Sequence, residues 1–290
     1  MTDQAEQLRE IMRTRNEDKD AGSRTRVIAV ASGKGGVGKT NMSINLAIAY
    51  AQLGKKVIVM DADLGLANVN VALGIIPKYN LYHLIRKKKK MKDIILDTDY
   101  GIQFVAGASG FSKIANLSED ELENFIEEIS SMAFADVIII DTSAGVSHNV
   151  LSFIAAADDA IIVTTPEPTA ITDAYGIIKI IATEIDNMNL GLKLIVNRVK
   201  SVTEGKKVAE RVISIASQFL NLKVDYLGYV YEDSSVSNAV LKQKPFMILD
   251  PNGKAAICVK HLVSRLEKVE FKEGGGVKQF IRRLIGKKVQ

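Results

Sequence analysis

The chain has a single cysteine, Cys258, and no tryptophan among its 290 residues. One cysteine excludes a disulfide framework and any metal site built from cysteines alone. No apolar stretch reaches the roughly 18 residues that a membrane-spanning helix needs, and the polar residues 1–20 lack the apolar core of a signal peptide. With 47% hydrophobic residues the chain can bury a large core. We therefore expect a soluble protein of the reducing cytoplasm.

The net charge of +4 is unevenly distributed along the chain. A basic run, RKKKK, occupies residues 86–90, and residues 274–290 contain no acidic side chain. The run follows a segment, 79–85, that predicts a short helix, and such a run is more typical of a solvated surface than of a nucleic-acid site. The three histidines lack the spacing of metal ligands, so we assign them no metal role.

Short apolar, β-branched runs alternate with segments of helical periodicity. The runs are nearly continuous in apolar character, which is typical of strands buried on both faces. The alternation predicts an α/β fold with a mostly parallel sheet and helices on both faces. We expect a body at 25–270, flanked by an N-terminal segment, 1–24, and a C-terminal segment, 271–290. The predicted strands are 26–32, 56–63, 102–107, 136–143, 160–165, 192–197 and 224–230, and the clearest predicted helices are 41–54, 118–132 and 204–220.

Residues 33–40 read GKGGVGKT and lie between a predicted strand and a predicted helix, the context of a Walker A phosphate-binding loop. Its glycines let the backbone N–H groups point at phosphate oxygens, helped by the positive end of the next helix. In such a loop Lys39 reaches the β- and γ-phosphates, and the Thr40 hydroxyl holds Mg²⁺. The loop therefore predicts ATP or ADP binding with Mg²⁺ through Gly33, Lys34, Gly35, Gly36, Val37, Gly38, Lys39, Thr40 and Asn41.

Lys34 is the unusual residue of this loop. A lysine near the loop entrance cannot easily fold back onto phosphates enclosed by its own loop, but it can reach those of a second subunit. An ordinary surface lysine is the alternative. With Lys34, the loop resembles the deviant Walker A motif of the MinD/ParA ATPases. The resemblance, over about residues 24–268, implies a P-loop NTPase of the SIMIBI class, a slow ATP hydrolase that works as a homodimer with Lys34 on the partner's nucleotide.

Three aspartates end two of the predicted strands. A single aspartate in such a place is more often a helix N-cap or a loop residue. Within the resemblance, residues 61–68 match switch I, which implies that Asp63 positions the attacking water and Asp61 belongs to the magnesium shell. Residues 137–145 match Walker B and switch II, which implies that Asp141 holds Mg²⁺ through water and the Gly145 N–H senses the γ-phosphate. The implied catalytic residues are Lys34, Lys39, Asp63 and Asp141, and the implied metal residues are Thr40, Asp61 and Asp141.

The implied base and ribose contacts rest on shorter matches. Residues 196–198 (VNR) resemble the adenine-reading segment of the family, where the Asn197 amide can donate to and accept from the base. Residues 231–236 resemble a second base-contacting loop, and residues 166–167 a ribose-facing element. The residues implied in this way are Glu167, Asn197, Arg198, Tyr231, Glu232 and Asp233. The choice of adenine rests mainly on the resemblance.

The N-terminal residues 3–9 (DQAEQLR) predict the start of a short amphipathic helix, with Asp3 as N-cap. A helix this short is not stable alone, so it orders either in a partner's groove or against its own body. The segment resembles the activator motif of the FlhG branch of the family, which stimulates the SRP-type GTPase FlhF, and Gln4 matches the stimulatory glutamine. The implied partner-binding residues are Asp3, Gln4, Ala5, Leu8 and Arg9.

The C-terminal residues 277–290 predict a helix with one apolar face, which is how a helix lying in the plane of a membrane is built. It resembles the membrane-targeting tail of MinD, and docking on the domain is the alternative. One such tail binds reversibly, whereas two in a dimer gain effective concentration. The apolar side chains are Val277, Phe280, Ile281, Leu284 and Ile285, and the basic ones include Lys278, Arg282 and Arg283.

Asn41 after Thr40, together with the N-terminal motif, resembles the FlhG branch rather than MinD itself. The implied function is a switch that dimerises with Mg-ATP and binds the anionic inner face of the cell membrane. It would control flagellar number and placement through FlhF and flagellar switch-complex proteins. A ParA-type DNA-partition ATPase and a MinD-type division-site regulator are the alternatives. We do not expect nucleic-acid binding, and an iron–sulfur carrier of this family would need more cysteines.

Overall fold

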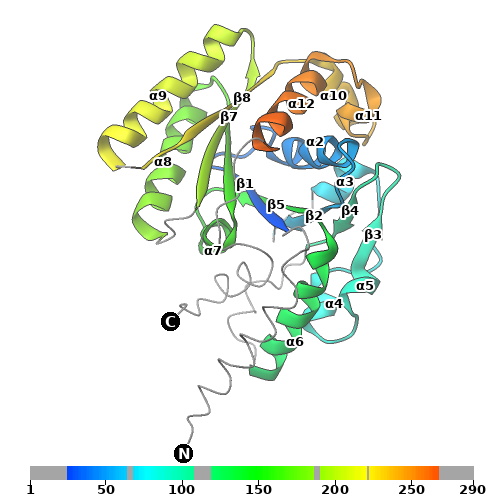
Figure 1. Ribbon diagram of the computed structural model, residues 1–290. Coiled ribbons are helices and arrows are strands. Elements are labelled where there is room, and N and C mark those ends of the chain that lie inside the picture. Colours follow the sequence, from blue (N-terminus) through cyan, green and yellow to red (C-terminus); the bar gives the residue numbers. More distant parts are fainter. Residues whose placement is uncertain (1–24, 64–67, 108–118, 186–189, 221, 268–290) are drawn as a thin grey trace, which may run out of the picture.

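The computed structural model describes residues 25–63, 68–107, 119–185, 190–220 and 222–267. The predicted N-terminal segment and the predicted C-terminal helix lie outside these residues. The described chain forms three layers, with one eight-stranded sheet between two layers of helices (Figure 1). Within the described ranges, no helix is both long enough and apolar enough to cross a bilayer.

The elements follow one another in the alternation that the sequence predicts. The strands are β1 (Arg26–Ser32), β2 (Val57–Ala62), β3 (Ile95–Asp97), β4 (Gln103–Val105), β5 (Val137–Ala144), β6 (Asp159–Thr164), β7 (Gly191–Val199) and β8 (Asp225–Tyr231). The helices of the first half are α2 (Lys39–Gln52), α3 (Val69–Leu73), α4 (Leu81–Ile85), α5 (Met91–Ile94), α6 (Glu119–Ser130) and the 3₁₀ turn η2 (Ser131–Phe134). Those of the second half are α7 (His148–Ala156), α8 (Pro168–Glu184), α9 (Val202–Leu220), α10 (Ser234–Leu241), α11 (Phe246–Leu249) and α12 (Lys254–Glu267).

The sheet has the strand order β3-β4-β2-β5-β1-β6-β7-β8, and all neighbouring pairs are parallel except β3 with β4. The mostly parallel sheet is confirmed, and so are its seven predicted strands. β3 was not predicted because it is only three residues long and lies, half-buried to exposed, at the edge. β1 lies in the middle, so the loop that leaves its carboxyl end opens at the centre of the sheet edge, where α/β sheets bind ligands.

Alternate residues of the strands pack into two separate hydrophobic cores, one on each face of the sheet. On β1, Val27 and Ala29 pack toward the layer of α4 to α9, while Ile28 and Val30 pack toward the layer of α2, α3 and α10 to α12 (Figure 1). All seven residues of β1 are buried. Burial on both faces explains why the strands read as nearly continuous apolar runs.

A buried charged cluster ties the opposite, amino-terminal edge of the sheet together. Asp159 accepts from Arg26 Nε at 2.7 Å and lies 2.8 Å from the Lys193 ammonium. The guanidinium of Arg26 also donates to the carbonyl oxygen of Leu266, at the end of α12, at 3.0 Å. Burial opposes the charge of Arg26, but the adjacent Asp159 carboxylate, together with the Tyr50 and Glu267 side chains, outweighs it, and the pKa of Arg26 is raised. Three strands and α12 therefore share one anchor, which the sequence did not predict.

Candidate nucleotide-binding site

The loop between β1 and α2 depends on glycine at several positions. Gly36 and Gly38 have φ values of 78° and 96°, in the left-handed region that favours glycine. A Cβ on Gly33 would lie 2.1 Å from the carbonyl oxygen of Asp173 in α8, and one on Gly38 would lie 2.4 Å from Nδ2 of Asn197. The loop is thus fitted against α8 and β7, and its path leaves no room for a side chain at Gly33 or Gly38.

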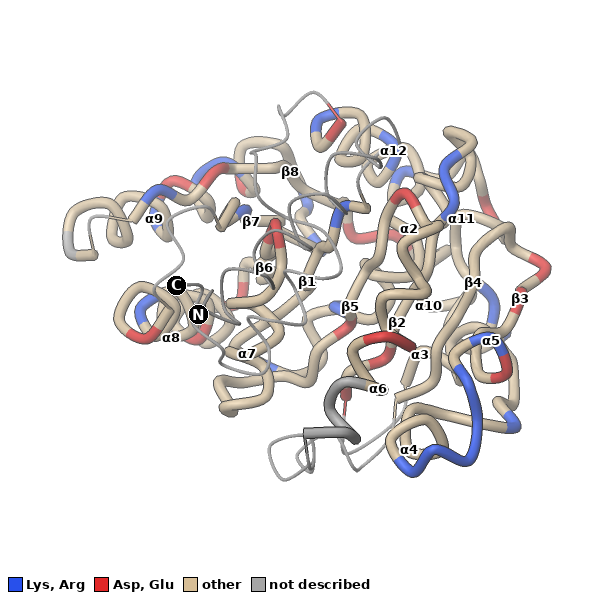
Figure 2. Tube along the Cα trace, turned by 60° about the horizontal axis from the view of Figure 1, so that its bottom comes forward, with Lys and Arg blue, Asp and Glu red and all other residues tan. Residues whose placement is uncertain are grey.

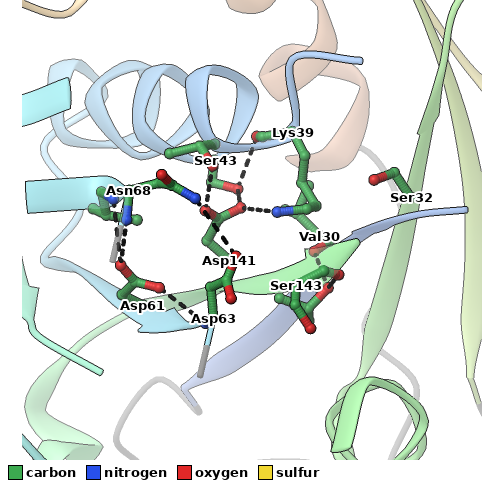
Figure 3. A network of polar contacts seen from close by, with 12 residues as sticks. Val30, Ser32, Lys39, Ser43, Asp61, Asp63, Asn68, Asp141 and Ser143 are labelled. Atoms are coloured by element: carbon green, nitrogen blue, oxygen red, sulfur yellow. Dashed lines mark hydrogen bonds and ion pairs between the residues drawn. The ribbon is translucent and has the colours of Figure 1, made fainter. Parts of the chain in front are cut away.

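The carboxylate of Asp141, on β5, is the centre of the site (Figure 3). Its Oδ1 lies 3.3 Å from the Lys39 ammonium and accepts from the Ser43 hydroxyl at 2.8 Å. Its Oδ2 accepts from the Thr40 hydroxyl at 2.7 Å. Asp141 and Lys39 are both buried, so the charges of the pair are little screened by water. The structure therefore brings together Lys39, Thr40 and Asp141, three of the residues that the resemblance implies for one site.

Asp61 lies beside Asp141 because the two residues are register partners on β2 and β5. Its side chain accepts from the backbone N–H groups of Asp63, at 2.9 Å, and of Val69, at 3.3 Å. Burial raises the pKa of Asp61 to about 6; the hydrogen bond from the Asp63 backbone opposes this rise, and the Asp141 charge adds to it. The carboxylates of Asp61 and Asp141 thus form a close acidic pair that a cation would stabilise.

Asp63 is half-buried at the end of β2, where the chain leaves the sheet. Its Oδ2 lies 3.5 Å from the amide nitrogen of Asn68, which precedes α3 (Figure 3). The rest of the predicted switch I, residues 64–67, lies outside the described residues. Asp63 is therefore placed at the same edge of the sheet as Asp61 and Asp141.

Lys34 does not join this cluster. Its ammonium lies 3.2 Å from a carboxylate oxygen of Glu167 and 2.7 Å from the hydroxyl of Thr169, at the start of α8. Its side chain is 38% exposed, whereas that of Lys39 is 9% exposed. The two lysines of one loop therefore have different environments, Lys39 inside the site and Lys34 at its rim.

Gly145, in the predicted switch II, has φ 91° and donates its N–H to the carbonyl oxygen of Ser32 at 2.9 Å. Ser32 directly precedes the phosphate loop. The predicted switch II is thus in direct backbone contact with the end of β1, where the phosphate loop begins.

Asn197 reaches the phosphate loop from the end of β7, and its side-chain amide donates to the carbonyl oxygen of Val37 at 2.8 Å. Arg198, next to it, is exposed and has φ 57°, a left-handed conformation that is uncommon outside glycine. The neighbouring strand β8 ends at Tyr231, which is the register partner of Val199. The predicted base-contacting segments therefore lie side by side on the edge of the sheet.

Glu232 and Asp233 follow β8. Glu232 is exposed, and its backbone N–H donates to the carbonyl oxygen of Val199 at 2.9 Å. The Asp233 carboxylate accepts from the N–H of Ser235 at 2.9 Å and of Ala255 at 3.1 Å, so it caps α10 and joins it to α12. Burial opposes ionisation of Asp233, but these backbone hydrogen bonds outweigh it, and the pKa of Asp233 is lowered. Asp233 therefore links the amino-terminal ends of α10 and α12 and holds the loop that follows β8 in place.

Two residues of the site were missed by the sequence reasoning. Ser43 is buried and bonds to Asp141; it stands four residues after Lys39, so the helical repeat places both on one face of α2, and this signal could have found it. Thr169 holds Lys34, and no local pattern indicates this, because the two residues are 135 positions apart.

The site has groups suited to phosphate and to Mg²⁺, the two parts of a magnesium-bound nucleotide. Within the described ranges no group of three or more histidine, cysteine or acidic residues is arranged to hold a metal ion. This fits Mg²⁺, which is commonly held by one or two carboxylates and the substrate's own phosphates. The side-chain oxygens of Thr40, Asp61 and Asp141, which could hold the ion, lie beside a glycine-rich loop with a buried lysine. Fold and site together define a P-loop nucleotide-binding protein.

Residues 28–246 match the CobQ/CobB/MinD/ParA nucleotide binding domain, and the chain belongs to this family. It is 36% identical to the antiactivator FleN of Pseudomonas aeruginosa, over 89% of this chain and 93% of the relative. It is 35% identical to the flagellum site-determining protein YlxH of Helicobacter pylori, over 98% of this chain and 99% of the relative. The resemblance to the FlhG branch of the MinD/ParA ATPases is confirmed.

The solved structures of relatives agree with the fold. MinD of Pyrococcus horikoshii, solved with Mg-ADP, superposes with a TM-score of 0.67 at 26% identity and covers 84% of this chain and 96% of its own. MinD in the MinC:MinD cell division complex of Aquifex aeolicus gives 0.68 at 26% identity and covers 86% of this chain and 100% of its own. The protein is therefore a MinD/ParA-type ATPase with an α/β P-loop NTPase fold.

Proposed function

We propose that the protein is a nucleotide-dependent dimerising switch that regulates the number and placement of flagella. Mg-ATP joins two copies, the dimer binds the inner face of the cell membrane, and slow hydrolysis separates the copies again. The observation that carries the dimerising mechanism is the different placement of Lys34 and Lys39. Because Lys34 lies at the rim, 38% exposed, it can serve a nucleotide on a second copy.

The ion pair between Lys34 and Glu167 does not oppose this role strongly. Both side chains are partly exposed, 38% and 56%, and an exposed ion pair contributes only about 0–1 kcal/mol. A triphosphate on a facing subunit offers several negative oxygens and a stronger partner. Lys34 can therefore exchange Glu167 for phosphate when two copies meet.

The remaining roles follow from the cluster around Asp141. Lys39 is held in the site by Asp141 and moves to the β- and γ-phosphates when ATP binds. Thr40, Asp61 and Asp141 would hold Mg²⁺, and the ion would supply positive charge beside the phosphate oxygens. Asp63 orients the attacking water, and Gly145 exchanges the Ser32 carbonyl oxygen for the γ-phosphate. We assign the contacts with the nucleotide base to the segments at the carboxyl ends of β7 and β8.

The flagellar role is supported by the relatives rather than by the site. YlxH is described as flagellum site-determining and FleN as an antiactivator, and both match this chain over nearly its whole length. We extend this to an FlhF-like GTPase partner for residues 3–9, to flagellar switch-complex proteins, and to an anionic membrane for residues 277–290. Both of these segments lie outside the described residues.

The dimerisation step has a direct test in Asp63→Ala. This variant keeps Lys39, Thr40 and Asp141, so it should bind Mg-ATP. It should hydrolyse the ATP too slowly for the two copies of the dimer to separate. Light scattering should report a stable dimer with Mg-ATP and a monomer with Mg-ADP. Asp99→Ala, an exposed aspartate in the β3–β4 turn, is the matched control and should behave as the unaltered protein. A monomeric Asp63→Ala protein at saturating Mg-ATP would contradict the proposal.

The flagellar output is tested by complementation in a flagellated bacterium that lacks its own homologue. The unaltered gene should restore the normal flagellar number, and Lys39→Ala should not. MinD of Bacillus subtilis is 31% identical over 82% of this chain, which favours division-site control as the second candidate. A defect in septum position with normal flagella would support that candidate instead.

A further inference from the structure

We propose that residues 76–92 form a second membrane-contact surface, which binds anionic lipid headgroups in addition to the C-terminal tail. We call it the basic–apolar surface. The proposal rests on the proposed function, because it presumes that the protein works at a membrane. It assigns a role to the RKKKK run, which the nucleotide site does not use.

The charged side chains of residues 78–92 are all positive. Residues 78–92 contain seven basic side chains, one at 78, five at 86–90 and one at 92, and no aspartate or glutamate. Figure 2 shows the run as a continuous basic stretch between α4 and α5. Most of these side chains are exposed, including Lys88, Lys90 and Lys92. A cluster of this density attracts the negative surface of a bilayer leaflet.

The loop that carries the run is firmly held by its backbone. Lys87 donates its N–H to the carbonyl oxygen of Leu84 at 2.8 Å, and Lys88 donates to that of His83 at 2.9 Å. The N–H of Lys90 is capped by the Asp93 carboxylate at 3.0 Å. The loop therefore presents its cations from a fixed position, which lowers the entropy cost of binding.

Lys87 has φ 53°, where glycine is the usual residue after a helix end. A lysine at this position has a conformational cost that glycine would avoid. The position thus keeps a positive charge where backbone conformation alone favours glycine.

Aromatic side chains are interleaved with the cations. The Arg86 guanidinium lies 5.5 Å from the ring centre of Tyr82, and the Lys89 ammonium lies 4.2 Å from that of Tyr79. Tyr82 is exposed at the edge of α4. Tyrosine is enriched where proteins meet the headgroup region, because its ring is apolar and its hydroxyl is polar.

An exposed aliphatic side chain begins the same segment. Ile76 is 96% exposed, the highest value among the large hydrophobic side chains of the described residues. It stands two residues before Lys78, the first of the seven cations. One aliphatic side chain is thus available for insertion from the segment that carries the cations.

The combination favours a bilayer over a nucleic acid. Cations with aromatic rings would also suit single-stranded nucleic acid, where the rings stack on bases. The almost fully exposed Ile76 side chain gains nothing from a phosphate backbone, but it gains from entering the boundary between headgroups and acyl chains. We therefore choose the anionic membrane, and the nucleic acid becomes an outcome of the test.

The test compares two triple variants of the full chain with Mg-ATP. Lys88→Gln/Lys90→Gln/Lys92→Gln removes three cations of the surface, and Lys206→Gln/Lys207→Gln/Arg211→Gln removes three exposed cations of α9 as a matched control. Binding is measured by flotation with vesicles of phosphatidylcholine alone or mixed with phosphatidylglycerol. With the mixed vesicles the first variant should lose affinity about a hundredfold, about fivefold per cation, and the control less than about threefold.

Two further variants make the result independent of folding and of the tail. Lys87→Gly removes one cation at a position whose φ favours glycine, so it should lose affinity about fivefold with an unchanged or higher melting temperature. Deleting residues 277–290 tests the tail separately: unchanged flotation would refute the tail's role in the proposed function and leave the triple variants to decide the surface.

Three results would overturn the basic–apolar surface. The first is unchanged vesicle affinity in Lys88→Gln/Lys90→Gln/Lys92→Gln. The second is a loss of binding to single-stranded or duplex DNA in this variant while vesicle affinity is unchanged. The third is the absence of binding of the unaltered protein to anionic vesicles at saturating Mg-ATP.

Discussion

At the scale of single residues, the chemistry of the site depends on two carboxylates that the sheet brings together. Asp61 and Asp141 are register partners on neighbouring strands, and both are fully buried. The Asp141 carboxylate forms an ion pair with Lys39 and accepts hydrogen bonds from the Thr40 and Ser43 hydroxyls. Asp61 receives only hydrogen bonds from backbone N–H groups among its described contacts, and burial raises its pKa. A cation bound beside Asp61 would offset the cost of ionising this carboxyl group.

This difference predicts a pH dependence of stability in the protein without Mg²⁺ and nucleotide. The pKa of Asp61 is raised from 3.8 to about 6, so between these pH values the folded protein holds a proton that the unfolded chain has released. The contribution of Asp61 to the free energy of unfolding should therefore fall as the pH rises from about 4 to about 6, by of order 1–3 kcal/mol.

Asp61→Asn should remove this contribution, because the amide does not titrate. Urea unfolding at a series of pH values gives the free energy for each protein, and the difference between the variant and the unaltered protein should grow across that range. Asp99→Asn, exposed, is the control. Parallel curves for Asp61→Asn and the unaltered protein would show that Asp61 ionises normally.

At the scale of elements, the phosphate loop is positioned by α8 as much as by its own strand and helix. Gly33 packs on the backbone of Asp173, and Thr169 and Glu167, at the start of α8, hold Lys34. The rim of the site is therefore an interface between the first and the second half of the chain.

Two alanine substitutions test this contact. Gly33→Ala places a Cβ 2.1 Å from the Asp173 carbonyl oxygen, so it should destabilise the protein by about 1–3 kcal/mol and weaken nucleotide binding. Gly176→Ala lies within α8 itself and meets nothing within 4 Å, so it should stabilise by about 0.5–1 kcal/mol. Chemical denaturation measures both. Equal stability of Gly33→Ala and the unaltered protein would mean that the loop does not rest on α8.

The buried cluster at the opposite edge of the sheet gives a second prediction at this scale. Asp159→Ala leaves Arg26 and Lys193 buried without their shared carboxylate, which should cost about 3–5 kcal/mol. The control Asp225→Ala removes an exposed ion pair with Lys223 and should cost less than about 1 kcal/mol. A small effect of Asp159→Ala on the melting temperature would show that water reaches this cluster.

The sequence predicted the elements better than the contacts between them. The strands could be predicted because burial on both faces leaves continuous apolar runs, and the phosphate loop because its glycines and lysine are consecutive. The edge strand β3 is too short to carry such a signal. The Lys34–Glu167 contact joins residues 133 positions apart, and the Arg26–Asp159–Lys193 cluster joins three strands. Only the folded sheet brings such residues together.

At the scale of the whole molecule, the two edges of the sheet differ in their polar residues: one edge is stabilised by buried ion pairs, and the other carries the candidate nucleotide site. The amino-terminal edge is closed by buried ion pairs and by the end of α12. The carboxyl-terminal edge carries the phosphate loop, the acidic pair and Lys34. In the proposed dimer, a second copy would meet this edge and bring its own Lys34 to the nucleotide. The complete site would then belong to the pair of molecules.

Mixing two inactive variants tests this claim most directly. Lys34→Ala keeps Asp63, and Asp63→Ala keeps Lys34, so neither protein alone has a complete site. If Lys34 acts across the dimer, a mixed dimer has one complete site, and an equimolar mixture should recover about a quarter of the ATP hydrolysis of the unaltered protein. If Lys34 acts on the nucleotide of its own chain, the mixture stays as inactive as its components, and the account is contradicted.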